Sequence, residues 1–333
     1  MILVTGGAGF IGSAIVAGLN SRGIDDILIV DILGRDEKWK NLRNLRFADY
    51  LEADDFYPRL TPTSNDFRFE AIFHLGACSS TTESDCSFLV RNNFECSRRL
   101  ASFAAPRGIR FIYASSAATY GDGAQGFSDN VEAIEQLRPL NMYGYSKQMF
   151  DLWARRNHLL DHIVGLKYFN VYGPNEYHKG EMRSFILKAF EQIRDKGRVG
   201  LFKSYRKDYT DGGQLRDFLY IKDAVAITLF FLDRPELAGI FNVGTGQARS
   251  WNDLASAVFT AMGRPAAIGY IPMPEILRDK YQYYTCAEMT KLRAAGYDRP
   301  TMPMEDAVKD YVQKYLINSE YLGEIAKPQH KEE

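Results

Sequence analysis

Short apolar runs alternate with longer stretches of helical periodicity through the first half of the chain. Within each run the apolar residues are nearly continuous, as expected of strands that have helices packed on both faces. Strands alternating with helices in this way are typical of βαβ units and a parallel sheet. The predicted strands are Ile2–Thr5, Ile27–Asp31, Ala71–Leu75, Arg110–Ser115 and Ile163–Asn170.

The rhythm changes after about residue 175. The later predicted elements are a helix near Glu181–Lys196, a strand at Val199–Phe202, a loop at Ser204–Gln214, a helix at Val225–Leu232, a strand at Ile240–Val243, a helix capped by Ser250 and a helix over Met304–Tyr315. We predict an α/β fold, with a Rossmann doubly wound parallel sheet and a smaller, mixed α/β C-terminal substrate domain. The Rossmann domain would take residues 1–175 and about 215–245, the substrate domain 176–214 and 246–320, and 324–333 would be a disordered tail.

The charge balance narrows the possible partners. The 333 residues include 41 Lys and Arg against 42 Asp and Glu, a formal net charge of -1. Nothing in this balance favours binding to nucleic acid or to an anionic membrane surface. Apolar runs stay shorter than the roughly 18 residues of a membrane span. The N-terminus lacks the pattern of a secretory signal, so a cytoplasmic location is expected.

Cysteine and histidine spacing gives no indication of a metal site. The four cysteines are predicted to be reduced, small buried residues, since none has CxxC spacing; they are Cys78, Cys86, Cys96 and Cys286. His158 and His162 stand four apart on a predicted helix, but the residues between them lack the Glu of a zincin motif. We interpret both as surface histidines and expect no metal.

A glycine-rich turn directly follows the first predicted strand. Thr5–Gly12 has the sequence Thr-Gly-Gly-Ala-Gly-Phe-Ile-Gly and opens a helix. Glycine is needed in such a turn because the backbone must bend tightly and approach a diphosphate at the helix N-terminus. The turn therefore predicts a dinucleotide cofactor.

Asp31 ends the second predicted strand, where an acid that binds the adenosine ribose is expected. Its carboxylate favours NAD because it repels a ribose 2′-phosphate, yet Arg35 and Lys38 follow closely and could pair with that phosphate. The residues alone leave NADP and NAD both open. Two further polar residues are either nucleotide contacts or solvated side chains: Asp49 and Asn92.

Tyr143 and Lys147 stand four residues apart, on one face of a predicted helix. The ammonium is expected to lower the pKa of the phenol, which would make it a general base near neutral pH. Ser115 and Ser116 end the fifth predicted strand, and ligands bind at this edge of an open α/β sheet. Together these groups suit removal of a proton from an alcohol as hydride leaves for a nicotinamide.

These segments, with Tyr168–Pro174, resemble the extended short-chain dehydrogenase/reductase family of nucleotide-sugar enzymes. Within this family, the likeness is to the epimerases that invert carbon six of an ADP-linked heptose for lipopolysaccharide core synthesis. It rests on Gly76–Glu83, Tyr113–Gly121, His178–Gly180, Arg216–Phe218 and Leu292–Tyr297. The resemblance implies an isomerase with bound NADP, or NAD, that oxidises carbon six to a ketone and returns hydride to the opposite face.

The resemblance also implies the site residues, an ADP-heptose substrate and a homopentamer. The implied catalytic residues are Ser116, Tyr143, Lys147 and, as second base, Lys179. The implied cofactor residues are Gly6, Gly9, Phe10, Ile11, Gly12, Asp31, Lys38, Leu75, Gly76, Ala77, Cys78, Ser79, Asn92, Lys147, Val171 and Lys179. The implied substrate residues are Ser116, Asn170, Glu181, Lys188, Phe202, Lys203, Ser204, Arg216 and Tyr281. Arg35, Lys38, Lys188 and Arg216 would form a basic pocket for the phosphates.

Several positions depart from the family pattern. Ile32 and Ala53 replace an Asn and a basic residue, which weakens the case for NADP, while Leu75 replaces a Glu and Lys188 a His. The alternatives are a UDP-hexose 4-epimerase, which needs no second base, another nucleotide-sugar epimerase or a dehydratase, and a non-catalytic NADP-binding protein. A dehydratase would require an acidic pair where the chain has Ala117–Thr119.

Overall fold

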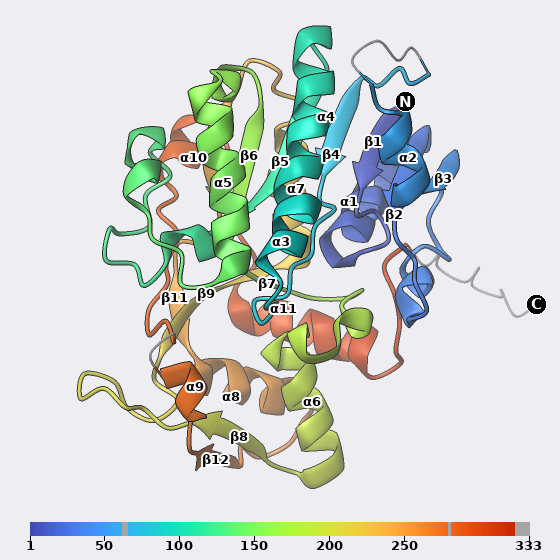
Figure 1. Cartoon of the computed structure of the whole chain (residues 1–333). Helices are drawn as coiled ribbons and strands as arrows, with labels where there is room; N and C mark the ends of the chain where they lie inside the picture. The colour runs from blue at the N-terminus through green and yellow to red at the C-terminus, as the bar shows by residue number, and fades with distance from the viewer. Residues whose placement is uncertain (62–65, 279–280, 324–333) are drawn as a thin grey trace, which may run out of the picture.

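A computed structural model of the chain describes residues 1–61, 66–278 and 281–323. The tail predicted at 324–333 lies outside the described residues. A parallel sheet of seven strands in the order β10-β6-β5-β4-β1-β2-β3 forms the centre of the fold (Figure 1). The strands are β1 (Ile2–Thr5), β2 (Ile27–Asp31), β3 (Asp49–Glu52), β4 (Ala71–His74), β5 (Arg110–Ser116), β6 (Val164–Tyr168) and β10 (Gly239–Val243).

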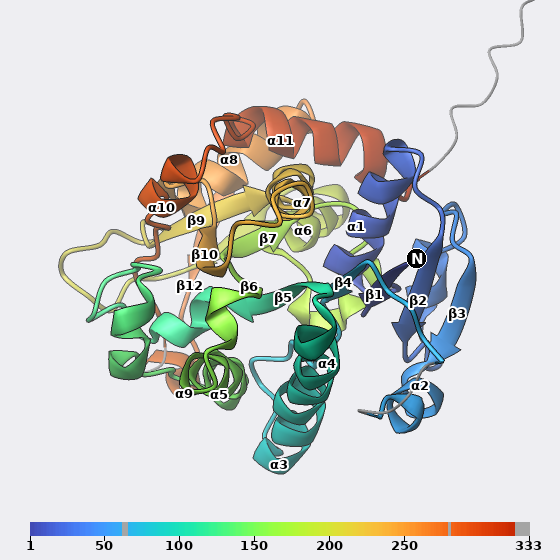
Figure 2. The same ribbon diagram turned by 90° about the horizontal axis from the view of Figure 1, so that it is seen from above.

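Helices cover both faces of this sheet, as the near-continuous apolar strands predict. Successive residues of a strand point to opposite faces, so Val4 of β1 joins one core cluster and Leu3 joins the other. Figure 2 shows α1 (Phe10–Ser21) and α7 (Ile221–Phe230) on one face. The opposite face carries α2 (Ala53–Arg59), α3 (Cys86–Leu89), α4 (Cys96–Ala104) and α5 (Met142–Arg156). The predicted doubly wound Rossmann fold is confirmed.

The smaller elements gather beyond the carboxyl ends of the central strands (Figure 1). One three-stranded sheet joins β7 (Asn170–Tyr172), β9 (Leu215–Tyr220) and β11 (Ala248–Ser250), and a parallel pair joins β8 (Val199–Phe202) and β12 (Ile268–Ile271). The helices of this part are α6 (Phe185–Lys196), α8 (Trp251–Ala261), α9 (Glu275–Arg278) and α11 (Met304–Tyr311). The short helix α10 (Thr290–Ala294) lies instead beside the start of β10, where Lys291 Nζ donates to the Ile240 carbonyl at 2.6 Å.

Two details differ from the sequence prediction. The run Ile163–Asn170 was expected to be one strand, but β6 ends at Tyr168 and Asn170 begins β7 in a different sheet. His158 and His162 do not share a helix, because α5 ends at Arg156 and His158 has a left-handed backbone with φ of 56°. The predicted Ser250 cap is confirmed, and it forms a capping box with Asp253.

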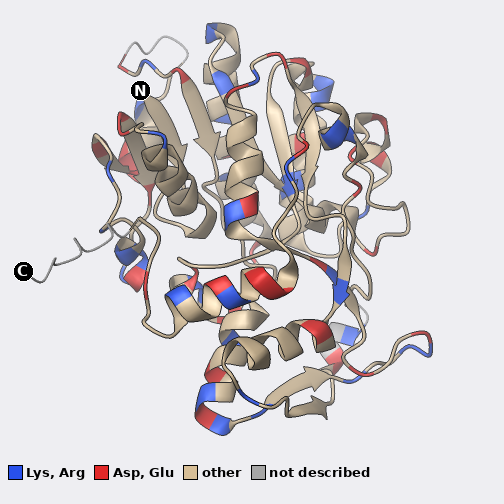
Figure 3. Ribbon diagram, turned by 180° about the vertical axis from the view of Figure 1, so that it is seen from behind, with Lys and Arg blue, Asp and Glu red and all other residues tan. Residues whose placement is uncertain are grey.

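The described part of the chain contains no helix that is both long and apolar enough to span a membrane. Lys and Arg are interspersed with Asp and Glu over the helices and loops seen in Figure 3. This mixed surface matches the near-zero net charge.

Candidate active site

The glycine-rich turn leaves no room for side chains at two of its positions. Gly6 has φ of +68°, and a Cβ there would lie 2.6 Å from the Gly76 nitrogen. A Cβ on Gly12 would lie 2.0 Å from the Gly6 oxygen. α1 begins next, at Phe10, and its N-cap Gly9 places no side chain over the first turn. The free N–H groups of that turn therefore face a space suited to an anion.

Asp31, at the end of β2, lies against this turn. One carboxylate oxygen accepts from the Ala8 and Gly9 nitrogens at 2.9 and 3.1 Å, and the other accepts from Lys38 Nζ at 3.0 Å. Sequence reasoning missed Glu52, whose carboxylate accepts from the Tyr50 hydroxyl at 2.9 Å, while that hydroxyl also reaches the Asp31 carbonyl. Two acids and one lysine thus gather at the end of β2, with Glu52 linked to Asp31 through the Tyr50 hydroxyl.

A cavity of about 320 Å³ runs from this turn to the end of β5. Every residue predicted to bind the cofactor lines it except Cys78 and Asn92. The glycine cradle, the open helix N-terminus and the elongated lining together fit a dinucleotide. Asp49 does not belong to the site, because it begins β3 at the opposite edge of the sheet and is exposed. Arg35 is likewise exposed and lies outside the lining.

Asn93 is buried beside the cavity, and sequence reasoning had chosen its neighbour. The Asn93 side chain bonds the Cys78 nitrogen at 2.8 Å, the Cys78 oxygen at 3.0 Å and Ser146 Oγ at 2.9 Å. Asn92 only donates to Asn93. A helical stretch with π geometry at Val90–Glu95 carries both residues, and this irregular turn could not be inferred from periodicity. Asn93 therefore fixes the loop that carries Cys78 against α5.

The two serines at the end of β5 have different environments. Ser115 donates to Asp151 at 2.8 Å inside the protein, whereas Ser116 Oγ accepts from the Ala118 nitrogen at 3.1 Å. Both serines line the first cavity, but Asp151 engages the Ser115 hydroxyl, and Ser116 alone of the two also lines the second cavity. Ser116 and Tyr143 line both the first cavity and a second one.

Tyr143 and Lys147 come together on α5, but their electrostatics differ from the expectation. Burial raises the pKa of Tyr143, a hydrogen bond with Ser116 opposes that rise, and Lys147 does not contribute. Lys147 Nζ instead donates to the Ala114 carbonyl at 2.8 Å, and burial lowers its pKa to about 8. The predicted lowering of the phenol pKa by Lys147 is therefore wrong for this structure, in which burial dominates and the Tyr143 pKa is raised.

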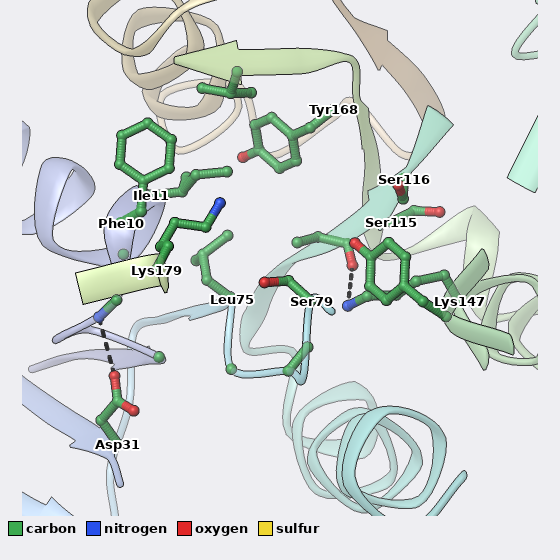
Figure 4. Close-up of a pocket in the computed structure, with 18 of the residues that line it drawn as sticks. Phe10, Ile11, Asp31, Leu75, Ser79, Ser115, Ser116, Lys147, Tyr168 and Lys179 are labelled. Carbon is green, nitrogen blue, oxygen red and sulfur yellow. Dashed lines mark hydrogen bonds between the residues drawn. The ribbon is translucent and has the colours of Figure 1, made fainter. Parts of the chain in front are cut away.

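Lys179 reaches into the first cavity from the other side (Figure 4). Its ammonium lies 5.2 Å from the centroid of the Phe10 ring, and Ser116 and Lys147 lie across the cavity. Burial lowers the pKa of Lys179, and the nearby Glu176 carboxylate opposes this effect. The fully buried Glu176 accepts from Ser184 Oγ at 2.6 Å and from the Tyr311 hydroxyl at 3.0 Å, so α6 and α11 both hold the segment that carries Lys179.

The second cavity, of about 380 Å³, contains a buried cation. Arg216, only 6% exposed, donates to the Leu215 and Gln282 carbonyls and lies over the rings of Tyr281 and Trp251. No carboxylate pairs with it in the described ranges of the chain. Of the predicted substrate residues, this cavity brings together Ser116, Asn170, Arg216 and Tyr281.

The other predicted substrate residues do not line either cavity. Lys188 Nζ pairs with the Glu181 carboxylate at 3.2 Å, and Glu181 is almost fully exposed. Phe202 contacts the Tyr281 ring edge-on, which places it one layer behind the lining. Lys203 and Ser204 follow in the same loop, outside the lining of both cavities.

Comparison with known proteins agrees with this geometry. Residues 2–244 match the model of the NAD dependent epimerase/dehydratase family. An ADP-L-glycero-D-manno-heptose-6-epimerase of Nitratidesulfovibrio vulgaris is 55% identical, over 95% of this chain and 98% of its own length. The crystal structure of the Helicobacter pylori ADP-L-glycero-D-manno-heptose-6-epimerase matches with a TM-score of 0.78 and 28% identity, over 94% of this chain and 95% of that one.

A second solved structure is a Thermus thermophilus UDP-glucose 4-epimerase complex with NAD. It matches with a TM-score of 0.72 and 26% identity, over 94% of this chain and 97% of that chain. Both the site and its relatives thus indicate a nicotinamide cofactor and a nucleotide-sugar substrate. The chain belongs to the NAD dependent epimerase/dehydratase family, within which it groups with the ADP-L-glycero-D-manno-heptose-6-epimerases.

Proposed function

We propose that this site inverts carbon six of ADP-D-glycero-β-D-manno-heptose to give the L-glycero epimer. One observation carries the proposal: Ser116 and Tyr143 line both cavities, so they stand where a sugar carbon could meet a nicotinamide. Arg216, a buried cation that pairs with no carboxylate of the described residues, supports a diphosphate in the second cavity. The names of the relatives support the heptose over other sugars.

A nicotinamide in the first cavity would take hydride from carbon six and return it to the other face. The chain's own residues would move the hydroxyl proton. Burial favours the neutral forms of both Tyr143 and Lys179, a phenol that can donate and an amine that can accept. One would remove the proton from the alcohol, and the other would protonate the ketone oxygen on the opposite face. Ser116 would hydrogen-bond the reacting oxygen, and Lys147 would bind the nicotinamide ribose.

We infer that the cofactor is NADP and that NAD is also accepted. Lys38 supports NADP because its ammonium lines the first cavity beside Asp31 and can pair with a 2′-phosphate. Glu52 and the loss of a basic residue at Ala53 favour NAD. Extraction of the purified protein and chromatography of the released nucleotide will distinguish them, and Lys38→Ala should weaken NADP binding more than NAD binding.

We also propose a homopentamer that works in the cytoplasm, on the family resemblance. The substrate domain would be built from residues 176–214 and 246–320, with 215–245 belonging to the Rossmann domain. Light scattering after size exclusion will measure the assembly, and a mass other than five copies would contradict it.

The decisive test is NMR of ADP-D-glycero-β-D-manno-heptose with the purified protein and no added cofactor. Inversion at carbon six is expected, whereas an unchanged spectrum from protein with bound nucleotide would overturn the proposal. UDP-galactose serves as the parallel substrate, and turnover of that sugar alone would favour a 4-epimerase.

Two variants test the residues. Tyr143→Phe and Lys179→Met should each remove most activity and keep bound nucleotide, whereas the exposed, ion-paired Arg206 gives a control as Arg206→Met. Normal turnover by Lys179→Met would rule out the second base.

A further inference from the structure

Asp151 of α5 and Lys167 of β6 form an ion pair behind the site. The Lys167 Nζ and the Asp151 carboxylate are 2.8 Å apart, and both side chains are 0% exposed. Neither residue lines a cavity of the site. The pair therefore lies in the protein interior, and substrate or cofactor would not touch it.

Hydrogen bonds join this pair to the strand end that carries Ser116. The Asp151 carboxylate accepts from the Tyr113 hydroxyl at 2.9 Å and from Ser115 Oγ at 2.8 Å, which fixes β5 on two sides of Ala114. Lys167 donates to Thr119 Oγ1 at 2.6 Å, and that hydroxyl donates to the Ser116 carbonyl at 2.8 Å. One continuous network thus runs from the ion pair to the backbone of Ser116.

The same carboxylate lies one helical turn after Lys147 on α5. Residues four apart on a helix share a face, so the Asp151 charge acts on the Lys147 ammonium. Lys147 also donates to the Ala114 carbonyl, which lies between the two β5 residues that bond Asp151. Asp151 is therefore linked to the catalytic set in two ways, by hydrogen bonds to strand β5 and by its charge to Lys147 on α5.

Stability alone does not account for such a pair. Removing two charges from water is costly, and well-packed apolar residues are often at least as stabilising as a buried ion pair. A fully satisfied network, however, holds its members in one arrangement. A positioning role accounts for charges at this depth directly behind Ser116 and Lys147.

We propose that Asp151 and Lys167 are positioning residues for this reaction, which fix the Ser116 strand end and keep a negative charge behind the Lys147 ammonium. This inference rests on the proposed function, because it takes Ser116, Tyr143 and Lys147 as the catalytic set.

The effect on pH dependence has a definite sign. Burial lowers the pKa of Lys147 and Asp151 raises it, with a smaller raising effect from Cys78 in the loop after β4. The other groups nearby are His74 on β4, which burial keeps neutral, and Lys167 itself. Removing the Asp151 charge should thus let the Lys147 pKa fall, and the alkaline limb of kcat should move to lower pH.

The test replaces both charges and keeps hydrogen-bonding groups, in Asp151→Asn/Lys167→Gln. We expect kcat at pH 8 to fall about tenfold and the alkaline limb to move to lower pH, because Asp151 raises the Lys147 pKa and Lys167 is not among the groups that shift it. The KM for ADP-heptose should stay within about twofold, because neither residue lines the substrate cavity. Lys167→Arg, with Asp151 in place, keeps both charges and should keep the wild-type pH profile. The surface pair gives the matched control, Arg22→Gln/Asp233→Asn, which should change nothing.

Thr119→Val provides a second test that leaves the ion pair in place. It removes the hydroxyl between Lys167 and the Ser116 carbonyl, so kcat should fall with no shift of the alkaline limb, and Thr119→Ser should restore it. The proposal would be overturned if kcat and the pH profile were unchanged in Asp151→Asn/Lys167→Gln. It would also be overturned if kcat were unchanged in Thr119→Val. If the double variant does not fold, Thr119→Val alone decides. A wild-type protein that leaves the heptose unchanged would instead count against the proposed function.

Discussion

Arg216 gives the sharpest test of the second cavity. Its guanidinium is buried and stacked on Tyr281 at 5.1 Å, and among residues 1–61, 66–278 and 281–323 it bonds only to backbone carbonyls. Burial lowers its pKa, which records the cost of a buried cation. A diphosphate would supply the missing negative charge through charge-assisted hydrogen bonds, each of which contributes roughly 1.5–3 kcal/mol. A loss of about 2 kcal/mol corresponds to about 30-fold in Kd.

Arg216→Met should therefore raise the Kd for ADP about 30-fold or more, as measured by titration calorimetry with ADP as probe. The free protein should melt no lower than wild type, because the variant removes a buried charge that no carboxylate neutralises in the described part of the chain. Arg206→Met is the matched control. Arg206 likewise lies over a tyrosine ring, that of Tyr283, but it is exposed and paired with Asp208. Its replacement should therefore change the Kd for ADP less than about twofold. Equal Kd values for wild type and Arg216→Met would refute this reasoning.

Three further predictions concern the cofactor cavity and its supports. Gly12→Ala should lose bound nucleotide, since its Cβ would lie 2.0 Å from the Gly6 carbonyl oxygen. Gly200→Ala, whose Cβ would meet nothing nearer than 3.5 Å, should keep the nucleotide. The measurement in each case is the nucleotide released on denaturation. Burial lowers the pKa of His178 to about 4 in the folded protein. As pH falls below about 6.5, the imidazole is therefore protonated in the unfolded chain but stays neutral in the folded one, which favours unfolding. The contribution of the neutral ring to stability, complete above about pH 6.5, is lost toward pH 4. The free energy of unfolding, measured with urea between pH 6 and 4.5, should depend on pH less steeply in His178→Gln than in wild type, by about 1.4 kcal/mol per pH unit. Equal slopes in the two proteins would contradict this prediction. Asn93→Ala should lower the free energy of unfolding by about 2 kcal/mol and weaken nucleotide retention, whereas Asn92→Ala should do neither. A larger loss of nucleotide in Asn92→Ala than in Asn93→Ala would favour the sequence prediction instead.

The strands of the central sheet were predictable because their signal is local. Ile2–Thr5 and Ile27–Asp31 are strands over the predicted residues, since short β-branched runs between glycine-rich or polar turns leave few alternatives. The strand near Ile163 was only half predictable. Its apolar run continues through Phe169, and the exchange of one sheet for another there depends on β9, which lies far along the sequence.

The site was predictable where spacing determines it and unpredictable where packing does. Tyr143 and Lys147 share a helix face, and Ser116 ends a strand, so local geometry suffices. The choice of Asn93 over Asn92 depends on an irregular helical turn against Ser146, and no periodicity encodes it. The pKa of Tyr143 depends on how deeply the folded chain buries the phenol, which the four-residue spacing to Lys147 could not show.

The buried cations show why net charge says little about such a site. Lys167 has a carboxylate partner at 2.8 Å, and Lys147 has a backbone carbonyl with Asp151 one turn away. Arg216 has only backbone carbonyls as hydrogen-bond partners among the residues that the structure describes. A buried cation with a carboxylate is already neutralised and can only position its neighbours, whereas one without a carboxylate is stabilised further by any anion that arrives. Lys167 therefore holds neighbouring residues in place, whereas Arg216 is suited to bind an anionic ligand. The partners of each cation, rather than the net charge of the chain, determine which of these two roles it has.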